Sequence, residues 1–360
     1  MELLSNTVEE VKSPTLEWME QVERNSGPLA AYLNENRAAV LWMHQSTHGI
    51  LFALLRPGHT VRIEATTTKA IQAFALLQAR ISRSGSALAE GTQVHGLLPP
   101  SMQSLLADPE IETVFLSPCW KSMHYPIEIV VSNRTYAGLG KLFVRTHGLQ
   151  EIATAMRRNP SGAKALLINP HYSGEHRLAD SELASESLRG LLEREGNWII
   201  NQPEPTVGHS RVISILSNIG VRLVNFNGHG NESEVVLGDG STLHWNDLLR
   251  EKLVGAPLVH LDCCKAGFDH GKGGGRFEGM AVAALRAGAS AVLASSLPVY
   301  DGSARLFSER LYAALLDPVD PASLCTAILL ARNEVYAQHG PHVRHWAAHV
   351  PWGNPAIRLR

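Results

Sequence analysis

Cysteine is scarce in this sequence, and its scarcity limits the kinds of fold that the chain can adopt. The 360 residues include four cysteines, namely Cys119, Cys263, Cys264 and Cys325. Four unevenly spaced cysteines are too few for a disulfide framework at this length, so we expect free thiols in a reducing, cytoplasmic compartment. The N-terminus has no basic head followed by an apolar stretch, so no signal peptide is expected.

Long apolar runs and blocks of one charge are also missing. No stretch of about 18 apolar residues is present, so we expect no membrane-spanning helix. Lysine and arginine together number 32 and the acidic residues 34, which gives a formal net charge of −2 without a basic block. These features argue against a nucleic-acid partner and against a membrane partner. The 44% hydrophobic and 18% charged residues are ordinary for a globular protein.

The first part of the chain, about residues 1–145, is predicted to be a separate α/β part. Residues 14–36 have the pattern of a helix that begins with proline in its first turn. Short strands with turn signals between them follow at 38–43, 49–55 and 60–65, which predicts an antiparallel meander. Two helices near 68–84 and 101–107 and a strand at 112–118 complete this part.

From about residue 146 onward, the sequence predicts an α/β domain with a mostly parallel sheet flanked by helices. Short apolar runs alternate with helical patterns, and this rhythm is typical of a parallel sheet covered on both faces. The predicted strands lie at 164–170, 197–201, 221–226, 257–261 and 290–296. The predicted helices lie at 180–195, 209–219, 244–253, 276–288, 302–316 and 321–338.

Two of these strands end in residues that can carry chemistry. The run "VRLVNFNGHG" ends at His229 and Gly230, and "LVHLDCCKAG" ends at Asp262, Cys263 and Cys264. Functional residues of such sheets lie beyond the carboxyl ends of the strands, and neighbouring strands are about 4.8 Å apart. An imidazole can activate a cysteine for attack on a carbonyl and later protonate the leaving amine. The N–H groups of Gly230 and Cys264 could then stabilise the oxyanion.

These motifs resemble those of the CHAT proteases, members of the caspase-like cysteine peptidases, which also include caspases, metacaspases and separase. That family has an apolar strand ending in His-Gly and a second strand ending in a Ser-Ala-Cys-Glu-Thr-Gly-like loop. The resemblance continues through "FEGMAVAALRAGASAVLASSLPVYDGSA" to "HWAAHVPWGNP", with Leu297 where the family usually has tryptophan. It is strong over residues 160–360 and weaker over 38–145, which resembles the degenerate front half of CHAT proteins.

The resemblance implies a cysteine endopeptidase that needs no cofactor. Aligning the loop glycine at Gly267 makes Cys264 the nucleophile and His229 its partner. Asp262 lies two positions before Cys264, as in metacaspases, where an aspartate helps to bind a basic substrate residue. Cleavage after Arg or Lys, with Arg favoured, is therefore expected, and Glu175 is a candidate second charge. Many bacterial CHAT proteins act in defence systems beside sensor modules, so a separate sensor or activator protein is an expected partner besides the protein substrate.

Alternation along the strand turns Cys263 to the opposite face from Asp262 and Cys264, as a small buried filler. A zinc site built from His260, Cys263, Cys264 and His270 is disfavoured, because adjacent cysteines on a strand diverge and the C-x2-C spacing is absent. The stretch 271–275 lacks the order of a phosphate loop and is predicted to be a mobile loop beside the active site. Two other functions stay open, namely a catalytically silent CHAT-like interaction module and a metal or nucleotide sensor.

Overall fold

The computed structural model describes residues 18–20, 22, 27–119, 121–122, 124–217, 220–267, 270–272 and 276–360. The chain forms two compact units. The first comprises Met1–Thr154 and Pro341–Val343, and the second comprises Ala155–Gly340 and Arg344–Arg360. Within the described ranges, every helix is too short or too polar to cross a lipid bilayer.

The first unit contains a mixed sheet with the strand order β3-β2-β1-β4-β7. The predicted antiparallel meander is confirmed, because β1 pairs with β2 and β2 with β3 in antiparallel register, whereas β1, β4 and β7 are parallel. The strands of this unit are β1 (Ala38–Gln45), β2 (Ile50–Leu55), β3 (Arg62–Ala65), β4 (Thr113–Pro118), β5 (Val131–Ser132), β6 (Thr135–Tyr136) and β7 (Leu142–Arg145). The helices are α2 (Thr68–Ser84), α3 (Leu88–Leu97), α4 (Pro100–Ala107), η1 (Ile127–Ile129), α5 (Ala137–Gly140) and α6 (Leu149–Ala155).

The second unit contains the mostly parallel sheet that the sequence predicts. Its strand order is β17-β16-β13-β10-β8-β9. All neighbouring pairs from β16 to β9 are parallel, and β17 is antiparallel to β16. The strands of the sheet are β8 (Lys164–Ile168), β9 (Ile199–Asn201), β10 (Val221–Asn227), β13 (Leu258–Asp262), β16 (Ala291–Ser295) and β17 (His349–Gly353). Two small hairpins are built from β11 (Glu234–Val236) with β12 (Thr242–His244) and from β14 (His270–Lys272) with β15 (Arg276–Glu278).

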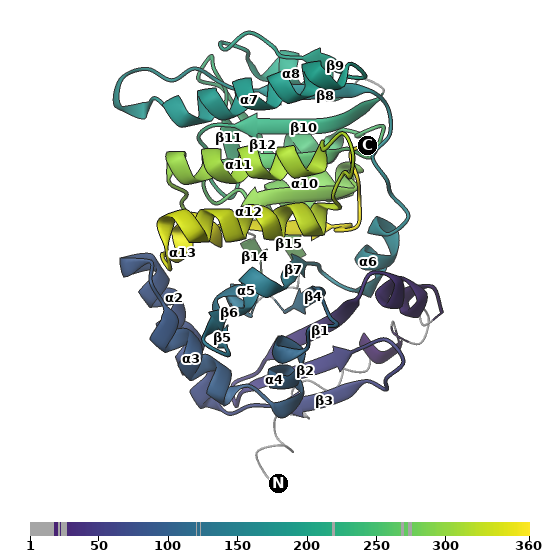
Figure 1. The fold of residues 1–360 in the computed structure, drawn as a ribbon, viewed down its shortest axis with the longest axis vertical. Coiled ribbons are helices and arrows are strands. Elements are labelled where there is room, and N and C mark those ends of the chain that lie inside the picture. Colours follow the sequence, from purple (N-terminus) through teal and green to yellow (C-terminus); the bar gives the residue numbers. More distant parts are fainter. Residues whose placement is uncertain are drawn as a thin grey trace. The chain divides into compact units, whose positions relative to one another are not determined.

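Helices cover this sheet in two groups. They are η2 (Gly174–His176), α7 (Ala179–Glu195), α8 (His209–Leu216), α9 (Trp245–Arg250), α10 (Met280–Ala287), α11 (Asp301–Leu315), α12 (Leu324–His339) and α13 (Val343–Trp346). Helix α11 packs between α7 and α12 (Figure 1). Helix α10 packs against α9 and β16. Strand β13 is buried along its whole length. Burial on both faces explains why its sequence is a short apolar run rather than an alternating one.

The structure differs from the sequence prediction at several boundaries. A helix was predicted to begin at Arg276, but Arg276–Glu278 form β15 and the helix begins at Met280. Gly279, which has extended backbone angles, separates the two elements. Strands β5, β6, β7, β11, β12, β14 and β17 and helix α3 were not predicted. Residues 14–17, 21 and 23–26 of the predicted first helix and 273–275 of the predicted mobile loop lie outside the described residues.

Candidate active site

The parallel pairing of β10 and β13 brings the two predicted catalytic segments to one edge of the sheet. The last pair in their register is Asn227 with Asp262. His229 and Cys264 each follow this pair by two residues, so they begin from the same level of the sheet. The N–H of Gly228 donates a hydrogen bond to the carbonyl oxygen of Asp262 at 3.2 Å, which extends the pairing beyond the strands.

Two hydrogen bonds position His229, one made by its ring and one by its backbone. Its Nε2 lies 2.8 Å from the carbonyl oxygen of His176, and its backbone N–H donates to the Oη of Tyr172 at 3.1 Å. A carbonyl oxygen only accepts, so Nε2 carries the proton in this bond. In the neutral ring the lone pair is therefore on Nδ1, which is the atom able to act as a base.

Tyr172 supports the loop that carries His229, a role that was not predicted from the sequence. Its ring meets the His229 ring edge-on at a centroid distance of 4.5 Å, and its hydroxyl donates to the carbonyl oxygen of Val236 at 2.8 Å. Burial raises the pKa of Tyr172 to about 12, with the hydrogen bond from His229 acting in the opposite direction. The hydroxyl is therefore protonated at neutral pH and can make both bonds at once.

Two glycines of the "NGHG" motif make room for this arrangement. A Cβ on Gly228 would lie 2.5 Å from the Oη of Tyr172, and a Cβ on Gly230 would lie 3.1 Å from the Sγ of Cys263. Gly230 also forms an antiparallel bridge with Val235. The hydrogen bonds that hold this bridge are made by the residues on either side of Gly230. The N–H of Gly230 takes no part in them.

The two adjacent cysteines lie in different environments. Cys263 is 3% exposed, whereas Cys264 is half-buried at the start of the turn after β13. Burial, with the nearby charges of Asp262 and Cys264, raises the pKa of the Cys263 thiol well above its usual value. The burial of Cys263 is as predicted. Since the thiolate is the reactive form, Cys263 is a poor nucleophile and Cys264 is the accessible one.

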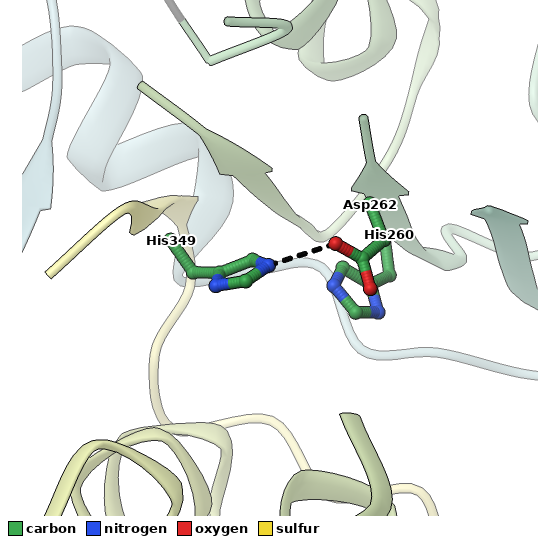
Figure 2. A group of neighbouring side chains, drawn as sticks. All are labelled: His260, Asp262 and His349. Carbon is green, nitrogen blue, oxygen red and sulfur yellow. Dashed lines mark hydrogen bonds and ion pairs between the residues drawn. The ribbon is translucent and has the colours of Figure 1, made fainter. Parts of the chain in front are cut away.

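Asp262 is buried, and both of its oxygens have partners. Its Oδ1 lies 3.0 Å from the Nε2 of His349, and its Oδ2 accepts a hydrogen bond from the Oγ of Ser308 at 2.9 Å (Figure 2). Burial opposes ionisation of this carboxyl, but the charge and hydrogen bond of His349, with smaller contributions from His260 and Ser308, lower its pKa to about 2. The side chain is 4% exposed, so the structure places it under α11 rather than in an open pocket.

Glu175 and the members of the disfavoured zinc group are the other residues that the sequence singled out. Glu175 lies in η2, next to the His176 carbonyl that holds His229, and its side chain is outside the described residues. His260 contacts Tyr312 of α11, whereas Cys263 lies against Gly230, so these two members of the disfavoured zinc group point to opposite faces. The side chain of His270 is outside the described residues. Among the described residues, His260 instead forms a group with Asp262 and His349.

Comparison with known proteins shows which solved structures share this fold. The structure resembles gingipain R, an Arg-specific cysteine proteinase, with a TM-score of 0.56 and 16% identity over 74% of this chain and 69% of that chain. It also resembles a Porphyromonas gingivalis complex of the pro- and mature domains of a gingipain, with a TM-score of 0.54 and 15% identity over 74% and 71%. Separase from Saccharomyces cerevisiae, solved with securin, gives a TM-score of 0.66 and 11% identity over 94% of this chain and 31% of that chain.

The fold is thus that of the caspase-like cysteine peptidases, as predicted from the sequence. The family model of the CHAT domain matches residues 204–354, which include β10, β13 and the loops that carry His229 and Cys264. This part of the chain therefore resembles a CHAT domain, and the fold of the chain resembles that of these peptidases. It spans about a third of the separase chain that it resembles. No curated protein matches the sequence.

Proposed function

We propose that this chain is a cysteine endopeptidase that cleaves a protein substrate with a His229/Cys264 dyad. The Cys264 thiolate attacks the carbonyl carbon, and the N–H groups of Gly230 and Cys264 stabilise the oxyanion. The proton taken from the thiol by Nδ1 of His229 passes to the leaving amine. Water then hydrolyses the thioester and restores the thiol. The observation that carries the proposal is the bond from His229 Nε2 to the His176 carbonyl, which leaves Nδ1 as the base.

The cleavage activity is tested by mapping which peptide bonds the full chain cuts in a denatured proteome. We expect new termini that are absent when Cys264→Ala replaces the wild type. A wild-type digest with the same termini as that of the variant would instead favour a catalytically silent interaction module, the main alternative function.

Tyr172 offers a test of the loop that positions His229. Tyr172→Phe keeps the ring but removes the hydroxyl shared by the His229 N–H and the Val236 carbonyl. We expect kcat/KM to fall about 10-fold and the free energy of unfolding to fall by about 1–3 kcal/mol, because two buried groups lose a partner. Peptide assays and denaturant melts measure these changes. Tyr125→Phe removes a buried hydroxyl of the first unit, bonded to Gln45, and should lower stability without lowering kcat/KM. Equal activity losses in both variants would contradict the positioning role.

We propose a basic P1 residue, Arg before Lys, as the substrate preference to test first. Asp262 lies two positions before Cys264, and gingipain R, which shares the fold, is described as Arg-specific. A carboxylate bonds guanidinium in a bidentate fork, which favours Arg. Direct contact with substrate requires that His349 or Ser308 release an oxygen of Asp262, because both oxygens are engaged. Glu175 is the second proposed source of negative charge.

The P1 preference is measured with fluorogenic peptides that differ only at P1. We expect Arg to exceed apolar P1 residues by about 10-fold or more in kcat/KM, because a buried unpaired charge penalises apolar groups. In Asp262→Asn this ratio should fall toward one. An Arg preference that persists unchanged in Asp262→Asn would assign Asp262 a structural role and leave Glu175 as the candidate.

We also propose that the activity is regulated by a separate sensor or activator protein. The separase that this fold resembles was solved in a complex with securin, which supports the proposal of a protein partner. A bacterial defence pathway and a cytoplasmic location are proposed from the resemblance to CHAT proteins and from the free thiols of this chain.

A further inference from the structure

A row of polar residues crosses the sheet of the second unit beneath α11. Asn227 pairs with Asp262, and Ser295 pairs with His349. The register of β13 with β16 pairs Leu261 with Ala294, which puts Ser295 beside Asp262. His260 precedes Asp262 by two residues and lies on the same face. Interior strands normally present apolar side chains to a covering helix, so a polar row in this position needs a physical reason.

Three residues of this cluster offer metal-ligating atoms to one point. Among the described residues, His260, Asp262 and His349 form the one such group, and one donor atom from each lies within 4.8 Å of the others. All three residues are buried, with exposures of 0%, 6% and 0%. Figure 2 shows the imidazole of His349 pointing toward the Asp262 carboxylate, and the imidazole of His260 lies close to the same carboxylate.

Neighbouring groups fix the orientation of both imidazoles. The His349 ring stacks on Phe307 with a centroid distance of 4.1 Å and an interplanar angle of 5°. Its carbonyl oxygen accepts a hydrogen bond at 2.7 Å from the buried guanidinium of Arg332. The Nδ1 of His260 lies 3.0 Å from the Oη of Tyr312. Metal-ligating histidines typically have a partner on the ring nitrogen that faces away from the ion, and Tyr312 is such a partner for His260.

The cluster also contains buried polar atoms that lack a hydrogen-bond partner. In the described part of the chain these atoms are Asn225 Oδ1, Asn227 Oδ1, His260 Nε2, Ser295 Oγ and His349 Nδ1. Each such atom costs about 1–3 kcal/mol when nothing satisfies it, so such groupings are rare in folded proteins. The Nδ1 of His260 also lies 3.2 Å from the Asn225 Nδ2, which donates to the Tyr312 hydroxyl at 3.1 Å. A metal ion on the unpartnered Nε2 requires that Nδ1 carry the proton and that the Asn225 amide turn its Oδ1 toward it.

We propose that His260, Asp262 and His349 bind one divalent transition-metal ion, with Zn²⁺ as the best match. Two imidazoles and one carboxylate are a donor set that zinc uses, whereas calcium and magnesium prefer oxygen donors alone. The ion would link β13 to β17 at a point two residues before Cys264. This site is separate from the four-residue zinc group considered in the sequence, with which it shares His260.

To hold zinc, the Asp262–His349 pair must open slightly, and donor atoms that lie farther apart must approach one another. Ligands at about 2.0–2.1 Å in a tetrahedron lie about 3.3 Å from one another. The Oδ1 of Asp262 and Nε2 of His349 are already 3.0 Å apart, and no pair of donor atoms exceeds 4.8 Å. The rival arrangement is a plain ion pair between Asp262 and a protonated His349, which binds no metal and makes the opposite prediction in the experiment below.

The test measures metal in the full chain, purified without a metal-affinity tag and dialysed against chelator. Zn²⁺ is then titrated by calorimetry, and thermal unfolding is followed with and without added Zn²⁺. We expect binding of about one equivalent with a Kd below about 1 μM and a Tm that rises with Zn²⁺, because the ion binds only the folded state. His349→Phe keeps an aromatic ring on Phe307, and Asp262→Asn keeps the shape of the carboxylate. Each should weaken Zn²⁺ binding more than about 100-fold, since loss of a supporting partner alone costs 10–100-fold.

Matched controls separate this site from binding at surface histidines. His339→Ala removes an exposed histidine that stacks on His345 and should keep the affinity of the wild type. Circular dichroism identifies variants that do not fold. The Zn²⁺ titration of the wild type tests the proposal even if a variant is unfolded. A wild type that takes up no stoichiometric Zn²⁺ would overturn the proposal, and so would tight binding that survives in a folded Asp262→Asn or is lost in His339→Ala.

Discussion

Cys264→Ala is expected to lower kcat/KM for peptide cleavage by at least about 10⁴-fold while the protein keeps its fold and its Tm. The nucleophile supplies the covalent step, and loss of a nucleophile in comparable peptidases removes nearly all of the rate enhancement. Cys264 is half-buried at the end of a strand, so its truncation to alanine leaves no large cavity. Progress curves with a cleavable peptide, compared with circular dichroism melts, measure both quantities.

Cys263→Ala is the matched control for this variant. Cys263 is 3% exposed and its thiol pKa is raised by burial, so alanine should keep activity within about 5-fold of the wild type. The same reasoning predicts that iodoacetamide modifies Cys264 in the native protein and leaves Cys263 unmodified. An inactive Cys263→Ala beside an active Cys264→Ala would shift the nucleophile by one residue and refute the assignment.

His229→Ala should lower kcat/KM by about 10³-fold or more, because the dyad loses the group that takes and returns the proton. The reaction of Cys264 with iodoacetamide at neutral pH should slow in this variant. His176 provides the matched control, because it acts through its backbone carbonyl, which His176→Ala retains. We expect His176→Ala to keep most of the activity. Comparable losses in both histidine variants would contradict the assignment of the proton transfer to His229.

The architecture was largely predictable because strand and helix periodicities are local properties of the sequence. The alternation of short apolar runs with helices predicted the parallel sheet, and the turn signals predicted the meander of β1, β2 and β3. The positions of His229 and Cys264, just beyond the ends of two neighbouring parallel strands, were predicted in the same way. The helix expected at Arg276 was wrong, because the apolar stripe of α10 continued backward into residues that form β15.

The support for the site was not predictable, because its partners are distant in sequence. The His176 carbonyl carries no side-chain signal, and Tyr172 is 57 residues from His229. The only signal in the sequence for the close approach of Tyr172 is the glycine at position 228, where a larger residue would clash with the tyrosine hydroxyl.

Asp262 shows the limit of strand alternation as a guide to function. Its position two residues before Cys264 predicted a shared face, but it did not reveal that His349, 87 residues away, and Ser308 occupy both carboxylate oxygens. β17, which carries His349, was itself not predicted as a strand. A pocket role and a metal-ligand role for Asp262 are therefore alternatives, which the P1 library and the Zn²⁺ titration separate.

Covalent trapping tests the dyad most directly. The full chain is incubated with a peptide acyloxymethyl ketone that carries Arg at P1, and the modified peptide is located by mass spectrometry after digestion. Our account predicts one adduct per chain on the Sγ of Cys264, none on Cys263, and a strongly slowed reaction in His229→Ala. An adduct on Cys263, or a rate on Cys264 that is unchanged in His229→Ala, would contradict it.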